Sequence, residues 1–202
     1  MARKTGGIVI KDYLNYLRLS QQYLITSQLI LQELRKNRNV NYVVSDKEIK
    51  DEEFWEITKW SDSNTLTPAL FILRHGMELL VKGLSGWAEI EHPKNHHVED
   101  MLKIIKNDKR FKDDLIKLIS LYVGSGKKQA LLQKFGDNNK LKNLDSSLNE
   151  ALRYPALLRE NKEVDFSSLL CQQSIILPDI DNIIDDIENI LREASKMVFN
   201  VD

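Results

Sequence analysis

The sequence lacks the features of a disulfide-bonded or membrane-spanning protein. Cys171 is the only cysteine, so an internal disulfide is excluded, and its apolar neighbours Leu169, Leu170 and Ile175 indicate a core position instead of a nucleophile. No apolar run is long enough to span a bilayer, and no secretory signal peptide is recognisable. We therefore expect a cytoplasmic protein that does not engage a membrane.

An excess of charge of either sign is also lacking. The chain has 29 Lys and Arg against 30 Asp and Glu, a net charge of −1, so any binding to an anion requires a local patch. The two ends differ, because residues 1–38 carry seven basic and two acidic residues, whereas residues 178–202 carry two basic and seven acidic residues. We expect the first and last helices to be neighbours, either within one bundle or across a dimer.

Strand-like alternation of apolar and polar residues is missing, as are internal repeats and low-complexity tracts. Apolar residues recur instead at spacings of three and four, the period of helices. With 202 residues, 42% of them hydrophobic and 29% charged, the composition is that of an ordinary globular protein. We predict an all-α antiparallel helical bundle with four to five main helices plus short ones, forming one domain over residues 10–202 after a flexible basic tail at residues 1–9.

The helical periodicity predicts long helices at both ends and in the middle of the chain. Ser20 and Ser27 lie seven residues apart in the first helix, where a partner helix could approach, and the tyrosines of the same helix either belong to the core or stack on bases. The expected helices cover residues 11–36, 47–59, 66–87, 96–107, 109–123, 127–135, 147–160 and 178–199, with Pro155 ending or kinking the seventh.

Residues 37–65 form an irregular insertion around the short helix expected at 47–59. An insertion of this length in a compact domain is often a lid or an interaction element. Trp55 and Trp60 lie within it, and they either clamp a ligand or pin the insertion to the bundle.

The rest of the chain is organised around residues 66–87, LTPALFILRHGMELLVKGLSGW. Thr67 is the expected cap and Pro68 fits the first helical turn. At 100° per residue the helix is apolar around most of its circumference, as in a buried helix. Gly76 and Gly83 lie together on one side, where a second backbone could approach closely. The single polar seam consists of Arg74, His75, Glu78, Lys82 and Ser85.

The polar seam has two interpretations. Arg74, Glu78 and Lys82 follow one another at spacings of four with alternating charge, which suits a self-neutralising ladder that sets helix register. Alternatively, a cation-rich buried seam beside His75 binds phosphate or a nucleotide. The residue pattern leaves both interpretations open.

Two other motifs lack a required member. Residues 124–128, GSGKK, resemble half of a phosphate-binding loop, but Leu121 occupies the position of the earlier glycine and neither Ser nor Thr follows Lys127, so we expect a turn between helices. His92, His96 and His97 are interrupted by a proline and lack a cysteine or a well-spaced carboxylate. We therefore predict no metal site and no cofactor.

Residues 70–84, LFILRHGMELLVKGL, resemble the central helix of the HEPN family, which is marked by a Glu-x3-Lys pair in an apolar frame, here Glu78 and Lys82. The spacing of His96 and the apolar residues after it is also similar, and Arg153-Tyr154-Pro155 resembles a segment of larger members. The resemblance implies an α-helical bundle, commonly a homodimer, with a cleft that binds nucleotide or RNA. Many members act as toxins or in antiviral defence.

The ribonucleases of that family carry an arginine, a polar residue directly after it, and a histidine that follows the arginine after four to six intervening positions, and no such motif occurs here. We therefore expect a non-catalytic HEPN-like module that dimerises and binds a nucleotide, RNA or a protein partner such as an antitoxin. The candidate ligand-binding residues are Arg74, Glu78, Lys82, His96, Arg153 and Tyr154.

The alternative is an enzyme, either a metal-independent ribonuclease or another nucleotide-acting enzyme with a degenerate site. In this hypothesis His75 is the general base and Arg74 stabilises the transition-state phosphate. A dimer would bring His96 or Arg153 into the same cleft. An unrelated helical bundle is the third hypothesis that the residues leave open.

Overall fold

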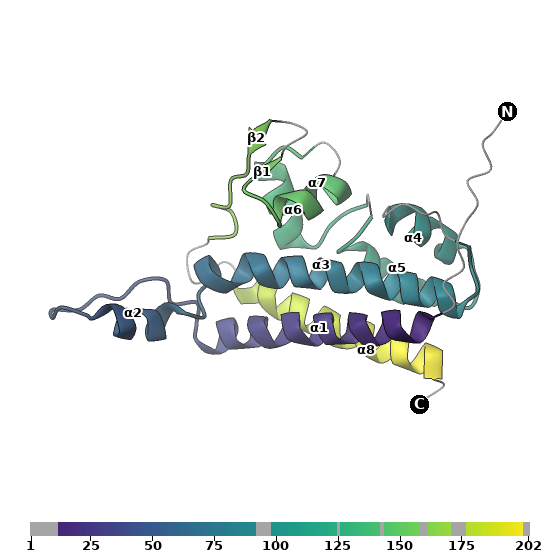
Figure 1. The fold of residues 1–202 in the computed structure, drawn as a ribbon, viewed down its shortest axis with the longest axis horizontal. Coiled ribbons are helices and arrows are strands. Elements are labelled where there is room, and N and C mark those ends of the chain that lie inside the picture. Colours follow the sequence, from purple (N-terminus) through teal and green to yellow (C-terminus); the bar gives the residue numbers. More distant parts are fainter. Residues whose placement is uncertain are drawn as a thin grey trace.

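A computed structural model describes residues 12–91, 98–124, 126–141, 144–157, 161–170 and 177–199. Within these residues the fold is all-α, as predicted, with one two-stranded hairpin in addition (Figure 1). The elements are α1 (Tyr13–Lys36), α2 (Asp51–Thr58), α3 (Asp62–Trp87), α4 (Val98–Lys106), α5 (Asp113–Ser120), α6 (Ala130–Asn138), α7 (Leu144–Ala151), β1 (Ala156–Leu157), β2 (Lys162–Glu163) and α8 (Leu177–Phe199).

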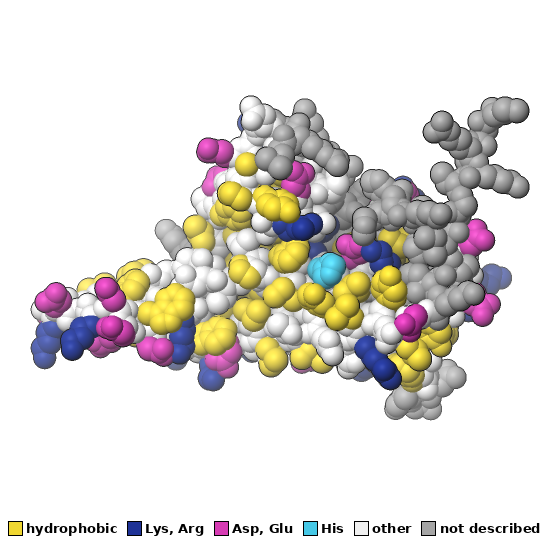
Figure 2. All heavy atoms as spheres, viewed as in Figure 1, with side chains coloured by type: hydrophobic (Ala, Val, Ile, Leu, Met, Phe, Trp, Pro, Cys, Tyr) yellow, Lys and Arg dark blue, Asp and Glu magenta, His cyan; other side chains and the backbone are white. Residues whose placement is uncertain are grey.

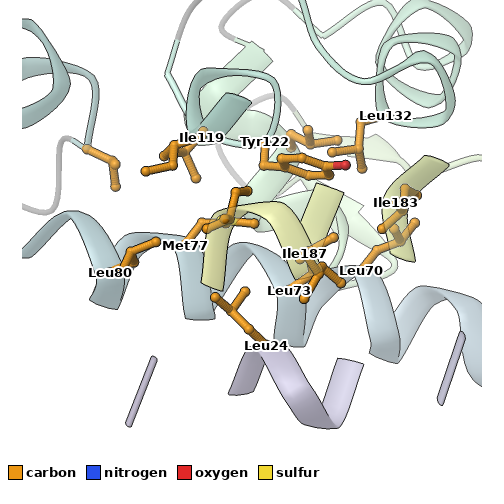
Figure 3. Packing of buried hydrophobic residues seen from close by; sticks show 14 of the residues in the cluster. Leu24, Leu70, Leu73, Met77, Leu80, Ile119, Tyr122, Leu132, Ile183 and Ile187 are labelled. Atoms are coloured by element: carbon orange, nitrogen blue, oxygen red, sulfur yellow. The ribbon is translucent and has the colours of Figure 1, made fainter. Parts of the chain in front are cut away.

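Three long helices form the body of the molecule. In Figure 1, α1 and α3 run antiparallel side by side, α8 lies behind them, and the short elements from α4 to β2 lie along the other side of α3. The apolar side chains of α3 meet those of α1, α8 and the segment from α5 to α6 in one continuous core (Figure 3). The residues labelled there are Leu24, Leu70, Leu73, Met77, Leu80, Ile119, Tyr122, Leu132, Ile183 and Ile187.

The contact between α1 and α3 is close enough for side chains to reach the opposing backbone. The Ser20 and Ser27 hydroxyls each donate a hydrogen bond of 2.9 Å, the first to the carbonyl of Gly76 and the second to that of Ala69. A Cβ on Gly83 would lie 2.6 Å from a methyl group of Leu17. The predicted close approach at these serines and glycines is therefore confirmed, and the approaching element is α1.

The start of α3 differs from the prediction. The helix begins at Asp62 after the N-cap Ser61, so Thr67 is not the cap and Pro68 lies inside the helix. The carbonyl of Ser61 accepts hydrogen bonds from both the amide and the hydroxyl of Thr65, which supports the additional first turn. The missing amide of Pro68 leaves the carbonyl of Asn64 without its usual helical donor, and both residues are exposed.

The basic first helix and the acidic last helix are neighbours within one chain. Arg35 Nε lies 2.5 Å from a carboxylate oxygen of Asp181, and the Gln28 side-chain amide donates to Glu188 at 3.0 Å. This confirms the pairing that the charge distribution predicted and places it inside the bundle.

The irregular insertion forms an arm, defined here as residues 40–61 and including α2. Figure 1 shows the arm extending beyond the end of the bundle at which α1 ends and α3 begins. Trp55 is 55% exposed and Trp60 is half-buried, so the arm does not use Trp55 to pin itself to the body.

The connections after α5 and after α7 differ in form. Apart from residue 125, which lies outside the described residues, residues 121–129 form the predicted turn between α5 and α6, with Gly124 at a φ of +95°. The helix expected at 147–160 ends with Ala151, and the chain passes through Pro155 into the β1–β2 hairpin, which the sequence pattern did not predict. Among the described residues, no helix is sufficiently long and apolar to cross a membrane. The predicted tail at residues 1–9 and Cys171 lie outside the described residues.

Candidate functional site

The polar seam of α3 divides into an inward and an outward part. Arg74 points inward, is only 4% exposed, and donates from Nη1 to the backbone carbonyl of Tyr122. A buried guanidinium that donates to a buried carbonyl ties two segments together. Arg74 therefore tethers the α5–α6 connection to α3 and is not presented to a surface ligand.

Tyr122 extends this tether to the last helix. Its hydroxyl donates a hydrogen bond of 2.5 Å to a carboxylate oxygen of Asp186 on α8. Burial raises the pKa of Tyr122 well above its usual value, and burial also raises the pKa of Asp186, although the hydrogen bond from Tyr122 opposes the second shift. The tyrosine hydroxyl thus stays protonated as a donor, and the network joins α3, the α5–α6 connection and α8.

Glu78 and Lys82, the Glu-x3-Lys pair of the sequence analysis, form an ion pair about one turn after Arg74 on α3. Lys82 Nζ lies 2.5 Å from Glu78 Oε1, and each side chain is only 13% exposed. This geometry matches the ladder interpretation for Glu78 and Lys82, whose charges compensate each other near the surface of the bundle. Neither side chain is simply solvated.

His75 occupies the outward part of the seam. Its ring lies 4.9 Å from the ring of Tyr23 on α1 in an edge-to-face arrangement. On α3 itself, Phe71 lies one turn earlier and is roughly parallel to His75, with centroids 6.3 Å apart. His75 is half-buried, so one side of this ring assembly reaches the surface.

The connection from α7 to β1 brings a cation onto the same assembly. The guanidinium carbon of Arg153 lies 5.7 Å from the centroid of Phe71 and 5.2 Å from that of Tyr154, both within the range of cation–π attraction. Arg153 and Tyr154 are exposed. We call Tyr23, Phe71, His75, Arg153 and Tyr154 the aromatic platform.

Figure 2 shows this face of the molecule. His75, the only histidine that the structure describes, appears in cyan between apolar side chains of α1 and α3, with dark blue basic side chains close by. The structure therefore brings His75 into one surface with the predicted residues Arg153 and Tyr154, within a single chain and without a second copy. It separates all three from the buried Arg74.

Sequence reasoning missed one member of the platform and left another open. Phe71 was not selected, although its position four residues before His75 on the same helix face was a usable signal. Tyr23 was weighed only as a member of a tyrosine stripe. His96 lies outside the described residues, as do His92 and His97.

The described part of the chain holds no group of three or more His, Cys, Asp or Glu side chains that could bind a metal ion. The side chains of the platform are rings and one guanidinium, and they offer stacking, cation–π attraction, and hydrogen bonds or ion pairs to an anion.

A scan of family models, a search of curated proteins and a search of solved structures each found no significant match to this chain.

Proposed function

We propose that this chain is a non-catalytic HEPN-like helical module that forms a homodimer and binds single-stranded RNA, or a nucleotide, on the aromatic platform. One observation carries the proposal: the exposed Arg153 guanidinium lies over Phe71, and Phe71 is stacked on His75. The cytoplasmic toxin–antitoxin or defence setting follows from the family resemblance alone. An antitoxin-like protein is the alternative occupant of the same surface.

The platform has the chemistry that single-stranded RNA requires. Unpaired bases stack on aromatic rings and on guanidinium planes, and each stacked base contributes about 1–3 kcal/mol by alanine substitution. Arg153 also supplies a positive charge for a phosphate, which a chain with a net charge of −1 must provide locally. Binding should therefore depend on few ionic contacts and fall only shallowly with salt.

The proposal is tested by fluorescence anisotropy with a labelled single-stranded oligoribonucleotide of about ten nucleotides. Phe71→Leu removes the ring but keeps an apolar side chain, and Arg153→Gln removes the charge. Each should weaken binding about tenfold, which corresponds to the loss of one stacked or ion-paired contact. Arg192→Gln, at an exposed arginine on α8, is the matched control. Unchanged affinity in both platform variants, with both folded, would refute the proposal.

The ribonuclease alternative is favoured by one specific contact. His75 and Arg153 both lie against Phe71, so a general base and a phosphate-binding cation share a surface. The same RNA is therefore incubated with the protein in the presence of a chelator. If the wild type cleaves the RNA and His75→Ala abolishes cleavage but retains binding, the ribonuclease is supported and the non-catalytic module is rejected. Binding without cleavage would reject the enzyme.

A further inference from the structure

The arm exposes more apolar surface than a solvated connection normally keeps. Val44 is 88% exposed and Trp55 is 55% exposed, and Tyr42, Phe54 and Ile57 are also exposed. On α2, Phe54, Trp55 and Ile57 share one side, Glu56 lies opposite, and Glu52 and Glu53 lie at the two edges of the apolar side. An exposed apolar helix face of this kind marks an interaction site.

The base of the arm is clamped, which gives the arm a defined direction. Asn39 is fully buried; its side-chain amide donates to an Asp62 carboxylate oxygen at 2.9 Å, and its side-chain carbonyl accepts from the Asp62 amide at 2.6 Å. The Asn64 side chain donates to the carbonyl of Thr58 at 3.0 Å. The arm is thus joined to the start of α3 at both ends and presents α2 away from the body.

A complementary groove lies at the opposite end of the bundle. It holds about 160 Å³ between α1, α3 and α8, and apolar side chains dominate its walls. Leu14 and Phe199 remain exposed there, with Phe199 at 57%. Arg18 is the only charged side chain among the described residues that line this groove. The described lining of the groove is therefore apolar, with one positive charge at its edge.

The charges of the two surfaces are opposite. Residues 46–56 of the arm contain six acidic residues against two lysines. Glu52 and Glu53 flank Phe54 and Trp55, and the apolar groove carries Arg18 at its edge. The acidic side chains at the edges of the aromatic side of α2 thus have Arg18, at the edge of the apolar groove, as a counterpart of opposite charge on the same chain.

The positions of the two surfaces allow both to be used at once. α1 has 24 residues, so it is about 36 Å long, with the groove at its first turns and the arm after its last turn. Ile25 and Leu29 are exposed on α1 between them. If two α1 helices lie antiparallel about a two-fold axis, each arm reaches the groove of the other copy and the assembly closes.

We propose that two copies of this chain pair through antiparallel α1 helices, with Trp55 of each arm seated in the α1–α8 groove of the other copy and Phe54 packed beside it. This inference rests on the homodimer of the proposed function and is independent of RNA binding. An interface of the standard size buries about 800 Å² per copy, and in this arrangement both arms and the exposed strip of α1 contribute to it.

The arm is tested by light scattering coupled to size-exclusion chromatography of the full chain. Phe54→Ser with Trp55→Ser should convert a dimer to a monomer, whereas Ile104→Ser, at a residue on α4 that is 38% exposed like Ile57, should leave the dimer unchanged. Because Phe54 and Trp55 are exposed, the double variant should keep its circular dichroism spectrum. A wild-type chain that is monomeric at about 100 µM, or a double variant as dimeric as the wild type, would overturn the inference.

A charge exchange tests the pairing of arm and groove. Arg18→Glu alone and Glu52→Lys with Glu53→Lys should each weaken the dimer about tenfold or more. Mixing the two variants should restore dimers, because in the mixed pair both arms meet a groove of opposite charge. Failure of the mixture to recover, or weakening by Arg18→Glu but not by the arm variants, would mean that another segment occupies the groove. An arm variant that is monomeric and still binds RNA leaves the RNA proposal intact.

Discussion

The α1–α3 contact and the arm both connect α1 with α3, yet apolar side chains are buried in the contact and exposed in the arm. In the contact, serines and glycines let the helices approach until hydroxyls bond to the opposing backbone and the leucines around them are fully buried. In the arm, Phe54 and Trp55 extend into solvent and the order comes from a polar clamp at the base. The difference shows that the body is specified by packing, whereas the arm is specified by hydrogen bonds at its ends.

The largest effect is expected from filling the space at Gly83. A Cβ there would lie 2.6 Å from a Leu17 methyl and 3.1 Å from the Leu17 backbone nitrogen, so Gly83→Val must push α1 and α3 apart. The free energy of unfolding should fall by about 3 kcal/mol in urea denaturation. Gly126→Val is the matched control, because nothing lies within 4 Å of a Cβ there. Equal stability of the two variants would contradict the close-packing account.

The next largest effect concerns the tether from α3. Arg74→Met fills a similar volume but leaves the buried Tyr122 carbonyl without this donor, so stability should fall by about 2 kcal/mol. Arg153→Met removes an exposed guanidinium and should change stability by less than about 0.5 kcal/mol. If the exposed arginine proved to be the more important of the two for stability, the assignment of Arg74 as a structural tether would be wrong.

The clamp at the base of the arm is probed by Asn39→Ala. The change removes both hydrogen bonds to Asp62 and places alanine at a φ of +51°, so the loss should be about 1–2 kcal/mol. Trypsin should also cleave faster at Lys47 and Lys50, which limited proteolysis followed by mass spectrometry would show. Asn138→Ala, at an exposed asparagine of α6, should be cleaved like the wild type. Unaltered cleavage in Asn39→Ala would mean that the clamp does not hold the arm.

A smaller effect follows from Asp186 in the body. Its native pKa is raised above the usual 3.8 by burial, so the folded state holds its proton more tightly than the unfolded chain does. This stabilisation is complete below pH 3.8 and is lost as the pH rises through the native pKa. Asp186→Asn removes that dependence, so the free energy of unfolding of the wild type relative to that of the variant should fall as the pH rises above 3.8. If the stability difference between the wild type and Asp186→Asn did not change with pH, the raised pKa of Asp186 would be contradicted.

The smallest effect on the stability of the folded chain is expected in the arm itself. Trp55→Ser removes a large side chain that the body does not cover. The free energy of unfolding, measured by thermal unfolding at low protein concentration, should therefore change by less than about 0.5 kcal/mol. Leu24→Ser, at a fully buried position of the α1–α3 contact, is the comparison and should unfold far more easily. A strong destabilisation by Trp55→Ser would show that the tryptophan does pin the arm.

The periodicity of the sequence predicted the long helices because each has an apolar face that repeats at the helical period and must be buried. The close approach of two helices was also predictable. Small residues spaced seven apart lie on the same face of a helix and leave room for a second backbone, as at Ser20, Ser27, Gly76 and Gly83. The start of α3 was misplaced because Asp62, its first residue, is hydrogen-bonded to Asn39, which is 23 residues away. The β1–β2 hairpin is too short to produce an alternating pattern.

The candidate site was predictable only in part. The seam was visible as a polar stripe, but one stripe on a wheel does not reveal which neighbours cover it, and adjacent residues differ by 100° in direction. Arg74 therefore turned toward Tyr122 while His75 turned toward Tyr23, and Arg153 reached Phe71 through a connection far along the chain. These contacts depend on long-range packing, which no local spacing encodes.

The sequence alone determined that this chain is helical, that one nearly apolar helix lies at its centre, and that its basic and acidic ends attract each other, because these properties follow from residue spacing and net charge along each segment. Only the tertiary structure decided that Arg74 is internal, that His75 and Arg153 share a surface, and that the arm stands away from the body. Those outcomes depend on which surfaces meet when the helices pack, and burial by distant neighbours sets the environment of each side chain.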